Sequence, residues 1–490
     1  MRFVNRKVLA AAFLVVLTGC FAAGSALISP AAAAGADATY LVLAPEGNST
    51  SKASARVAAA GGTVVAAYPQ IGVLVARSAD PGFATAASGA GVEAVASTAG
   101  LGTPLQDEVT NGTVDSAAAD ATGNPTAEPM WGLQWDMQQI DVAEAHAVTT
   151  GSSNVVVGVL DTGISSTHPD LMTQIAKDKS VSCLGGVINT AEAAWNPTTS
   201  DHGTHVAGTI AAAINGVGIA GVAPGVKVAA VKVVTDAGFI YPEAAVCGFV
   251  WAADHGMQIT NNSYFIDPWE FNCRNDARQR PVWQAVQRAI RYSQSKGVLN
   301  VASAGNSNVD LQHKFVDASS PNDGSSPVET RTINGACVDL PAEAPGVVTV
   351  SAVGTERLKS YYSSYGQGVV DVSAPGGDTR QPNPAVSTTA NAVLSATFNV
   401  VTRTNGWGYK QGTSMASPHA AGVAALALSQ NPGLSPGALA SFLERTSESL
   451  PCPEGVYNPR PGLNFLAECT GGSRNGFYGA GEVNAYNAVR

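Results

Sequence analysis

From about Met130 onward, the chain alternates short β-branched runs with alanine-rich runs of helical length. The strand-like runs include NVVVGVL, VKVAAVKVV, VLNVASAGN and GVVTVSAVG, and the runs between them include HGTHVAGTIAAAI and RPVWQAVQRAIRYSQSKG. Strands that are apolar throughout are buried on both faces, and parallel strands need long crossovers that are usually helical. The pattern therefore predicts an α/β fold over residues 130–490, with a parallel sheet covered by helices on both faces.

Three further segments precede this domain. Residues 37–98 alternate short β-rich runs with alanine-rich runs, which predicts a small α+β domain. Residues 99–129 are rich in Thr, Gly, Ala, Pro and acidic residues and have no apolar period, which predicts a flexible linker. Residues 1–36 have the composition of a targeting segment.

In this first segment a basic start is followed by an apolar run and then by PAAAAGADA, with small-residue cleavage sites after Ala34 or Ala36. We expect a cleaved export signal and an extracellular, secreted protein. Two alternatives stay open. The LTGC sequence at 17–20 resembles a bacterial lipobox, which would leave Cys20 lipidated and the protein anchored at the outer face of the cell membrane. The apolar run is also long enough to remain as a membrane anchor.

The charge of the chain limits its possible binding partners, and its cysteine content indicates disulfides. The net charge is −10, charged residues make up 13% of the chain, and there is no basic run, so nucleic acid is excluded as a partner. We expect a monomer. Of seven cysteines, all but Cys20 follow the signal segment, and an even number in an exported chain predicts disulfides. Cys452–Cys469 is the favoured disulfide because it would close the shortest loop, while the other pairings stay open. The absence of a CxxC pair argues against a structural zinc site.

Four polar residues stand where strands end or helices begin. Asp161 ends the apolar run VVVGVLD, His202 begins HGTHVAGTIAAAI, Asn306 follows the run NVASAG, and Ser414 precedes an alanine-rich run. In parallel sheets, functional groups gather at the carboxyl ends of the strands. Each residue also has an ordinary structural explanation, such as helix capping by Ser414. His202 and His205 could form a metal pair, but the glutamate of an HExxH motif is absent.

Together the four residues supply the parts that acyl transfer needs. A serine hydroxyl becomes nucleophilic when an imidazole takes its proton, and a carboxylate fixes the imidazole's tautomer and stabilises its cation. The tetrahedral oxyanion then needs preorganised donors, which a helix N-terminus at Ser414 and the amide of Asn306 can provide.

The motifs VLDTGI, DHGTHVAGT, ASAGN and GTSMASPHAAG resemble those of the subtilisin-like serine proteases, in the same chain order. The resemblance covers about residues 130–490. It implies a serine endopeptidase with Ser414 as nucleophile, His202 as general base and acid, and Asp161 as orienting carboxylate. The side chain of Asn306 and the amide of Ser414 would form the oxyanion hole. No catalytic metal is implied, and the substrate would be a polypeptide.

Two other functions are weighed against this one. A catalytically silent domain of the same fold could bind peptides, but all four chemical positions are filled. An esterase on a different fold is disfavoured because the motif order is wrong and the GxSxG elbow is absent.

The resemblance also implies a precursor and a structural cation. Residues 37–98 resemble the family's pro-domain, which acts as an intramolecular chaperone and inhibitor, so the linker at 99–129 would contain or adjoin the self-cleavage site. A calcium ion would be held by Asp170, by Asn215 and by backbone carbonyls of Ala213, Val217 and Ile219. An ordinary turn capped by Asp170 is the alternative, because no glutamine aligns with the family's N-terminal ligand.

The two strands expected to flank a bound peptide depart from the family's small residues. They contain Gly238, Phe239 and Ile240 in one segment and Ser263, Tyr264 and Phe265 in the other. The aromatic side chains either narrow the cleft and form apolar pockets or turn inward as core. The first alternative predicts a narrow substrate range.

Overall fold

The computed structural model describes residues 37–47, 49–98, 108–114, 124–322 and 327–490. The expected export signal, the lipobox at 17–20 and Cys20 lie outside these ranges. Among the helices of the described ranges, none combines the length and the hydropathy needed to cross a bilayer.

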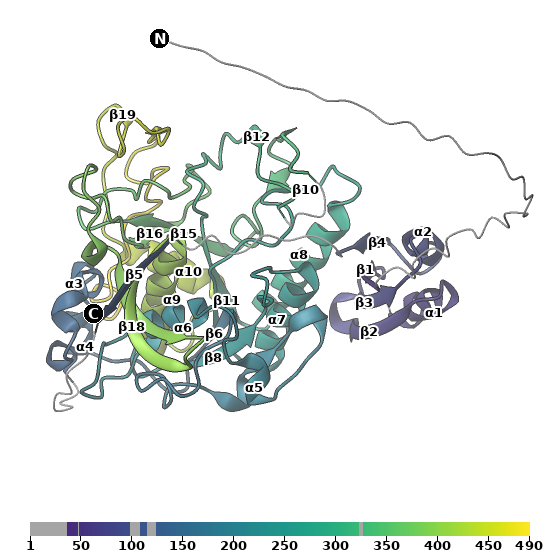
Figure 1. Cartoon of the computed structure of the whole chain (residues 1–490), viewed down its shortest axis with the longest axis horizontal. Helices are drawn as coiled ribbons and strands as arrows, with labels where there is room; N and C mark the ends of the chain where they lie inside the picture. Colours follow the sequence, from purple (N-terminus) through teal and green to yellow (C-terminus); the bar gives the residue numbers. More distant parts are fainter. Residues whose placement is uncertain (1–36, 48, 99–107, 115–123, 323–326) are drawn as a thin grey trace, which may run out of the picture. The chain divides into compact units, whose positions relative to one another are not determined.

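A seven-stranded parallel sheet forms the centre of the large domain (Figure 1). Its strand order is β16-β15-β11-β9-β6-β8-β7. The strands are β6 (Val156–Asp161), β7 (Val181–Ser182), β8 (Lys227–Lys232), β9 (Ile259–Asn262), β11 (Leu299–Ser303), β15 (Val347–Val353) and β16 (Val372–Pro375). All neighbouring strands in it are parallel, so the predicted α/β fold is confirmed.

Helices cover both faces of this sheet. They are α6 (His202–Ala211) and α9 (Thr413–Gln430) on one face, and α7 (Pro242–Asp254) and α8 (Arg280–Ser295) on the other. Strand β6 shows why its sequence is apolar throughout: Val157 and Val159 pack in the cluster of α6 and α9, whereas Val156 and Leu160 pack in that of α7 and α8. Helix α10 (Pro436–Thr446) packs on α9 through Leu439.

Shorter elements lie in the connections. The helices among them are α3 (Trp135–Gln139), α4 (Val142–His146) and α5 (Glu192–Trp195). The strands form two-residue pairs: β10 (Asn272–Cys273) with β14 (Cys337–Val338), β12 (Val316–Asp317) with β13 (Arg331–Thr332), and β19 (Val456–Tyr457) with β20 (Ala467–Glu468). Three disulfides join Cys183 to Cys247, Cys273 to Cys337, and Cys452 to Cys469. The predicted Cys452–Cys469 pairing is confirmed.

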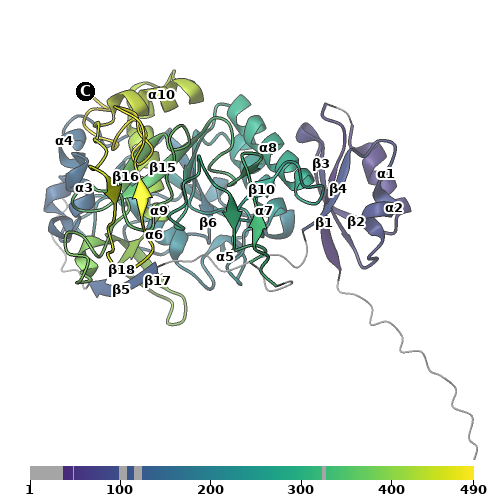
Figure 2. The ribbon, with the colours of Figure 1, turned by 90° about the horizontal axis from the view of Figure 1, so that it is seen from above.

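The small domain is a four-stranded antiparallel sheet with two helices on one face (Figure 2). Its elements are β1 (Ala38–Leu43), α1 (Ser51–Ala59), β2 (Thr63–Tyr68), β3 (Val73–Ser78), α2 (Phe83–Ala87) and β4 (Ala94–Ser97). Val42 and Leu74 pack against the two helices. Leu41 and Val75, on the opposite face, belong to the same apolar cluster as α7 and α8 of the large domain.

Polar contacts surround this shared cluster. The hydroxyl of Tyr68 donates to the carbonyl of Gly186 at 2.6 Å. The guanidinium of Arg288 donates to the carboxylate of Glu93 at 2.6 Å and to the carbonyl of Ala44 at 2.8 Å. Because Arg288 is almost fully buried, these contacts fix the small-domain sheet against α8.

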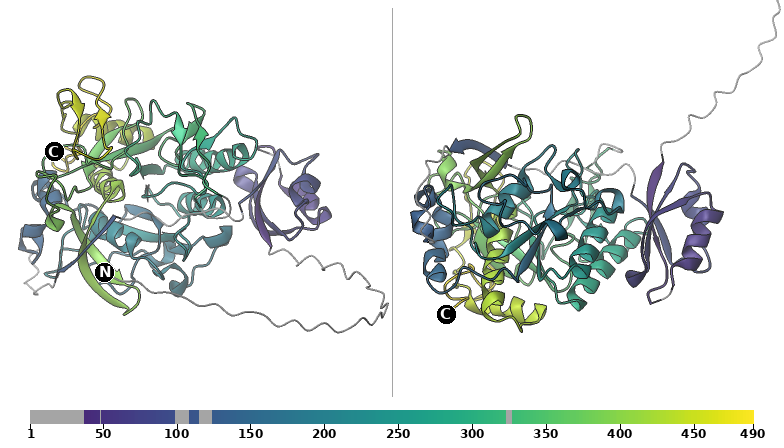
Figure 3. Two further views of the ribbon diagram at one scale, coloured as in Figure 1. Left: turned by 45° about the horizontal axis from the view of Figure 1, so that its top comes forward. Right: turned by 90° about the horizontal axis from the view of Figure 1, so that it is seen from below.

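A second, three-stranded antiparallel sheet consists of β17 (Val393–Asn399), β18 (Thr404–Gln411) and β5 (Glu108–Val114). The dark blue β5 lies beside the lime strands in Figures 1 and 3, and Glu108 pairs with Gln411. The segment expected to be a flexible linker thus contains a strand. Its composition gave no sign of this because the edge of β18, a distant part of the chain, supplies the partner groups.

Candidate active site

The carboxylate of Asp161 and the imidazole of His202 form a buried pair at the carboxyl edge of the large sheet. Nδ1 of His202 lies 2.8 and 2.9 Å from the two carboxylate oxygens. The carboxylate can only accept, so Nδ1 carries a proton. The amide of Thr162 also donates to Asp161 at 2.7 Å, and both side chains are almost fully buried. Such a buried charge needs these donors.

The local sequence around the pair explains how α6 reaches the end of β6. The amide of Gly203, in the first turn of α6, donates to the hydroxyl of Thr162 at 2.9 Å. A β-carbon at position 203 would stand 2.5 Å from the carbonyl oxygen of Gly163. Only glycine therefore lets the helix start this close to the strand end.

Ser414 lies at the same sheet edge, in the first turn of α9. Leu160 of β6 is level with Asn262 of β9, so Asp161 is level with Ser263. The hydroxyl of Ser263 donates to the carbonyl of Ser414 at 3.0 Å, and the hydroxyl of Ser414 donates to the carbonyl of Ser263 at 3.3 Å. The start of α9 is therefore attached to the strand beside β6.

Asn306 is bonded to the start of the same helix. Its Oδ1 accepts from the amide and from the hydroxyl of Thr413, both at 2.9 Å. An amide N–H can only donate, which assigns the oxygen and leaves Nδ2 free to orient as a donor. A β-carbon at Gly412 would stand 3.5 Å from that nitrogen. Asn306 thus presents an amide donor beside the residues that precede Ser414.

His205 takes no part in this arrangement. Its Nε2 lies 3.1 Å from the carbonyls of Val393 and Gly408, so that nitrogen donates. Burial, together with the charge of Lys410, lowers the pKa of His205 to about 3. A neutral, buried imidazole that donates to carbonyls is a packing residue, and it does not pair with His202 as a metal ligand.

Comparisons with known proteins identify the family of the chain. The sequence profile of the Subtilase family, Peptidase_S8, matches residues 152–481. The chain belongs to the subtilase family. Subtilisin Savinase from Lederbergia lenta is 31% identical over 361 residues, which are 73% of this chain and 99% of that protein. Fervidolysin from Fervidobacterium pennivorans is 29% identical over 340 residues, 67% of this chain, and these span only 42% of fervidolysin.

The fold is also that of solved subtilases. The epidermin leader peptide processing serine protease EpiP from Staphylococcus aureus superposes with a TM-score of 0.65 at 21% identity, covering 93% of this chain and 98% of that chain. This likeness concerns the fold. With the family shown, the chain is a subtilisin-type serine peptidase whose substrates are polypeptides.

The segments expected to flank a peptide differ in exposure. Tyr264 is buried, and its hydroxyl donates to Oδ1 of Asn262 at 3.0 Å, so its ring belongs to the core of this subtilase. Ile240 and Ser263 are buried too. Gly238, Phe239 and Phe265 are half-buried, and Phe239 packs edge-on against Tyr241, with ring centroids 6.0 Å apart.

The expected calcium ligands lie together, with one residue that the sequence did not indicate. Nδ2 of Asn215 donates to Asp170 at 3.3 Å, and Trp407 Nε1 and the amide of Ile219 donate to its other oxygen at 2.7 and 3.3 Å. Glu128 accepts from the amide of Gly216 at 2.9 Å, and its Oε2 is buried without a hydrogen-bond partner in the described ranges.

Burial raises the pKa of Glu128, and it raises that of Asp170 to about 7, with the charge of Glu128 adding to the effect. The carboxylates of Glu128 and Asp170 lie close together, and one oxygen of Glu128 has no partner in the described ranges. Such a pair fits a hard divalent cation that takes oxygen ligands. Within the described ranges no group of three or more His, Cys, Asp or Glu side chains is arranged to hold a metal ion, so backbone carbonyls would complete the set here. The amide of Val217 donates to Oδ1 of Asn215 at 2.9 Å and that of Ala213 to the carbonyl of Asp170 at 2.9 Å, which orders the loop.

Proposed function

We propose that this subtilase is an exported endopeptidase that cleaves peptide bonds through Ser414, His202 and Asp161 and is made as a self-cleaving precursor. The observation that carries the proposal is the buried Asp161–His202 pair at the sheet edge where α9 begins with Ser414. The pair keeps the proton on Nδ1, so Nε2 is the nitrogen that can accept the serine proton.

In the proposed mechanism, Ser414 Oγ attacks the scissile carbonyl carbon while His202 Nε2 takes the hydroxyl proton. The carboxylate of Asp161 stabilises the imidazolium that forms. The oxyanion accepts from the Ser414 amide, which as a first-turn N–H has no intrahelical partner, and from Nδ2 of Asn306. His202 then gives the proton to the leaving amine, and water hydrolyses the acyl-enzyme by the same steps.

The precursor proposal is supported by two features of the chain. The sheet of residues 38–97 shares an apolar cluster with α7 and α8, as expected for a domain that assists folding and inhibits the enzyme. Strand β5 runs alongside β18 with Glu108 opposite Gln411, three residues before Ser414, so the start of β5 pairs with the end of the strand that precedes the nucleophile. Self-cleavage would therefore fall in the linker, shortly before β5.

A bound calcium ion would have a structural role. Glu128, Asp170 and Asn215 would hold it together with carbonyls of Ala213, Val217 and Ile219, and it would offset the two buried negative charges. Its chemistry is electrostatic, and it takes no part in peptide cleavage.

The test is Ser414→Ala in the full precursor. We expect the variant to accumulate uncleaved, whereas the wild type loses about the first 100 to 130 residues. Identical processing of both would refute self-maturation. A wild type that neither reacts with a serine-directed phosphonate nor cleaves peptides would instead indicate a silent peptide-binding domain, and cleavage of simple esters but not peptides would indicate an esterase.

A further inference from the structure

The carboxylate of Asp339 is buried without a full set of partners. The residue is 3% exposed and follows directly after β14, and its Oδ1 has no hydrogen-bond partner in the described ranges. Buried carboxylates normally have a cation or several donors, because an unpaired one is costly. A residue that departs from this rule needs a physical explanation.

This carboxylate lies beside the segment that carries the oxyanion amide. Oδ2 of Asp339 is 3.6 Å from the place where a β-carbon of residue 305 would stand. Gly305 has a φ of +93°, a conformation that glycine adopts without strain, and it directly precedes Asn306. On the other side of Asn306, the hydroxyl of Ser307 hydrogen-bonds the carboxylate of Glu270. Two acidic side chains therefore flank Asn306.

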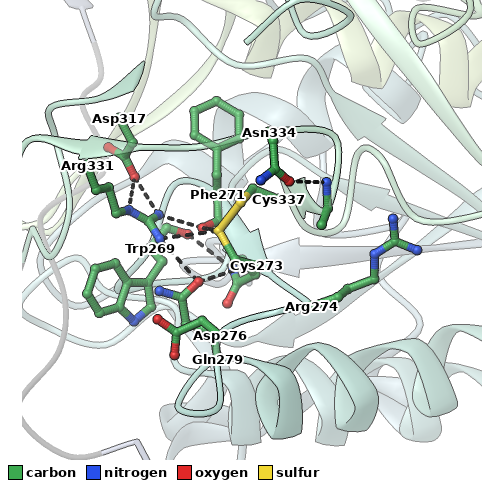
Figure 4. Close-up of a disulfide and its surroundings, with 12 residues drawn as sticks. Trp269, Phe271, Cys273, Arg274, Asp276, Gln279, Asp317, Arg331, Asn334 and Cys337 are labelled. Carbon is green, nitrogen blue, oxygen red and sulfur yellow. Dashed lines mark hydrogen bonds and ion pairs between the residues drawn. A yellow bond between two sulfur atoms is a disulfide. The ribbon is translucent and has the colours of Figure 1, made fainter. Parts of the chain in front are cut away.

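The nearby cations are already bound to other carboxylates. Arg331 donates to Asp317 at 2.9 Å and to Gln279 at 3.2 Å, and its guanidinium stacks over the ring of Trp269 at 4.5 Å (Figure 4). Lys314 forms an ion pair with Glu343. Neither cation forms a hydrogen bond or an ion pair with Asp339 in the described ranges, so no cation neutralises this carboxylate by direct contact.

The segment that carries Asp339 is held rigidly. The disulfide Cys273–Cys337 joins β10 to β14 two residues ahead of it, as Figure 4 shows. The carbonyl of Leu340, the next residue, accepts from the amide of Ile266 at 2.8 Å, next to the peptide-flanking segment 263–265. The amide of Asp339 itself donates to Glu343 at 2.7 Å. The carboxylate is therefore preorganised, which binding a charged group requires.

Burial raises the pKa of Asp339 well above its ordinary value, and the charges of Glu343 and Glu270 raise it further, while Lys314 lowers it. This direction is the one expected for a carboxylate in a cation-poor environment. A cationic group brought beside it would favour the ionised form and remove much of the cost of its burial.

We propose that Asp339, aided by Glu270, binds the side chain of the substrate residue that precedes the scissile bond and selects lysine or arginine there. The inference rests on the proposed function, in which Asn306 binds the oxyanion. That oxyanion comes from the carbonyl of the residue before the cleaved bond. The side chain of this substrate residue is therefore attached next to the carbonyl that Asn306 contacts, on the side where the two acidic groups lie. A guanidinium or an ammonium group at its end would supply the hydrogen-bond donors that Asp339 lacks.

The test compares matched fluorogenic peptides that differ only in this residue: arginine, lysine, leucine and citrulline. Citrulline has the shape of arginine but no charge. For the full wild-type chain after processing, kcat/KM for arginine and lysine should exceed that for citrulline and leucine by about 100-fold or more, since the site discriminates by a buried charge. Asp339→Asn should remove this advantage while cleavage of the leucine peptide continues.

Asp276→Asn is the matched control. It also removes one carboxylate from the region around the Cys273–Cys337 disulfide, but this carboxylate is partly exposed and already forms an ion pair with Arg278. It should keep the wild-type preference. Equal cleavage of arginine and citrulline peptides by the wild type, or an unchanged preference in Asp339→Asn, would overturn the inference. If Asp339→Asn fails to fold, the wild-type comparison decides alone. Phosphonate labelling separates the two proposals: a labelled, peptide-cleaving enzyme without basic preference refutes only this one, and an unlabelled, inactive enzyme refutes both.

Discussion

Glu243, the second residue of α7, makes the association of the two domains sensitive to pH. Its side chain is buried where the small domain packs on the large one, and it interacts with the hydroxyl of Thr98 and with the charge of Arg77 from that domain. Burial raises its pKa, and those interactions offset the rise only in part, so the pKa is about 7. If the small domain is cut from the chain and leaves, Glu243 meets water and its pKa returns toward 4.5.

The direction of the pH effect on association depends on which state of the protein binds the proton of Glu243 more tightly. The assembled state has the higher pKa, so it binds more protons than the separated domains between about pH 4.5 and 7. Association is therefore strongest below pH 4.5 and weakens as the pH rises through 7. The difference between about 7 and 4.5, at about 1.4 kcal/mol for each pKa unit, gives a limit of about 3 kcal/mol, or about 300-fold in Kd.

The assay uses Ser414→Ala, which cannot degrade its own domain, with a recognition sequence for an unrelated protease placed within 99–107. After cutting, the retention of the small domain is measured by gel filtration and its Kd by titration at pH 5 and pH 8. Glu243→Gln keeps the shape and the hydrogen bond to Thr98 but cannot ionise, so its Kd should hardly change with pH. A wild-type Kd that changes less than about threefold, or a variant that keeps the wild-type pH dependence, would refute the reasoning.

Three further outcomes follow from other parts of the chain. If Glu128 is a calcium ligand, free calcium at about 100 times its Kd should raise the unfolding free energy by about 2.7 kcal/mol, and Glu128→Gln should weaken this gain in a chelator titration; thermal stability that ignores calcium would contradict it. His419→Gln should cost about 3–5 kcal/mol in denaturant unfolding, because Nε2 of His419 pairs with Asp136 at 3.0 Å and both side chains are fully buried; a loss below about 1 kcal/mol would be inconsistent with that pair. No lysine or arginine occurs between Arg77 and Lys177, so the linker is a poor substrate for an enzyme that selects basic residues. Gln106→Arg should therefore speed precursor processing by about tenfold or more, measured as a gel time course. Gln106→Met, the uncharged control, should leave the processing rate unchanged.

The general architecture could be predicted from the sequence because its signals are local. An apolar run such as residues 156–160 shows by its composition that both faces of the strand are buried, and the structure divides its side chains between two helical layers. The Cys452–Cys469 disulfide could be favoured because only 17 positions separate its cysteines. The two other disulfides each span 64 positions, and their pairing depends on the tertiary fold.

The residues that sequence reasoning missed act through distant contacts. Glu128 approaches Asp170 only because the end of the linker segment packs against the loop at 215–217. Asp339 stands in a stretch with no periodic pattern, and its lack of a partner is visible only when its neighbours are in place. Strand β5 depends on an edge that β18 provides. The signal that the sequence did contain for Asp339 was an acidic residue two positions after a cysteine.

In the proposed mechanism, the Asp161–His202 pair makes one particular hydroxyl, that of Ser414, reactive. The direct measurement is peptide mapping by mass spectrometry after reaction with a fluorophosphonate, for the wild type and for His202→Ala. We expect a label on Ser414 alone, and a labelling rate in His202→Ala that is lower than in the wild type by about 10³-fold or more. A label on a different serine, or an equal rate without the imidazole, would contradict it.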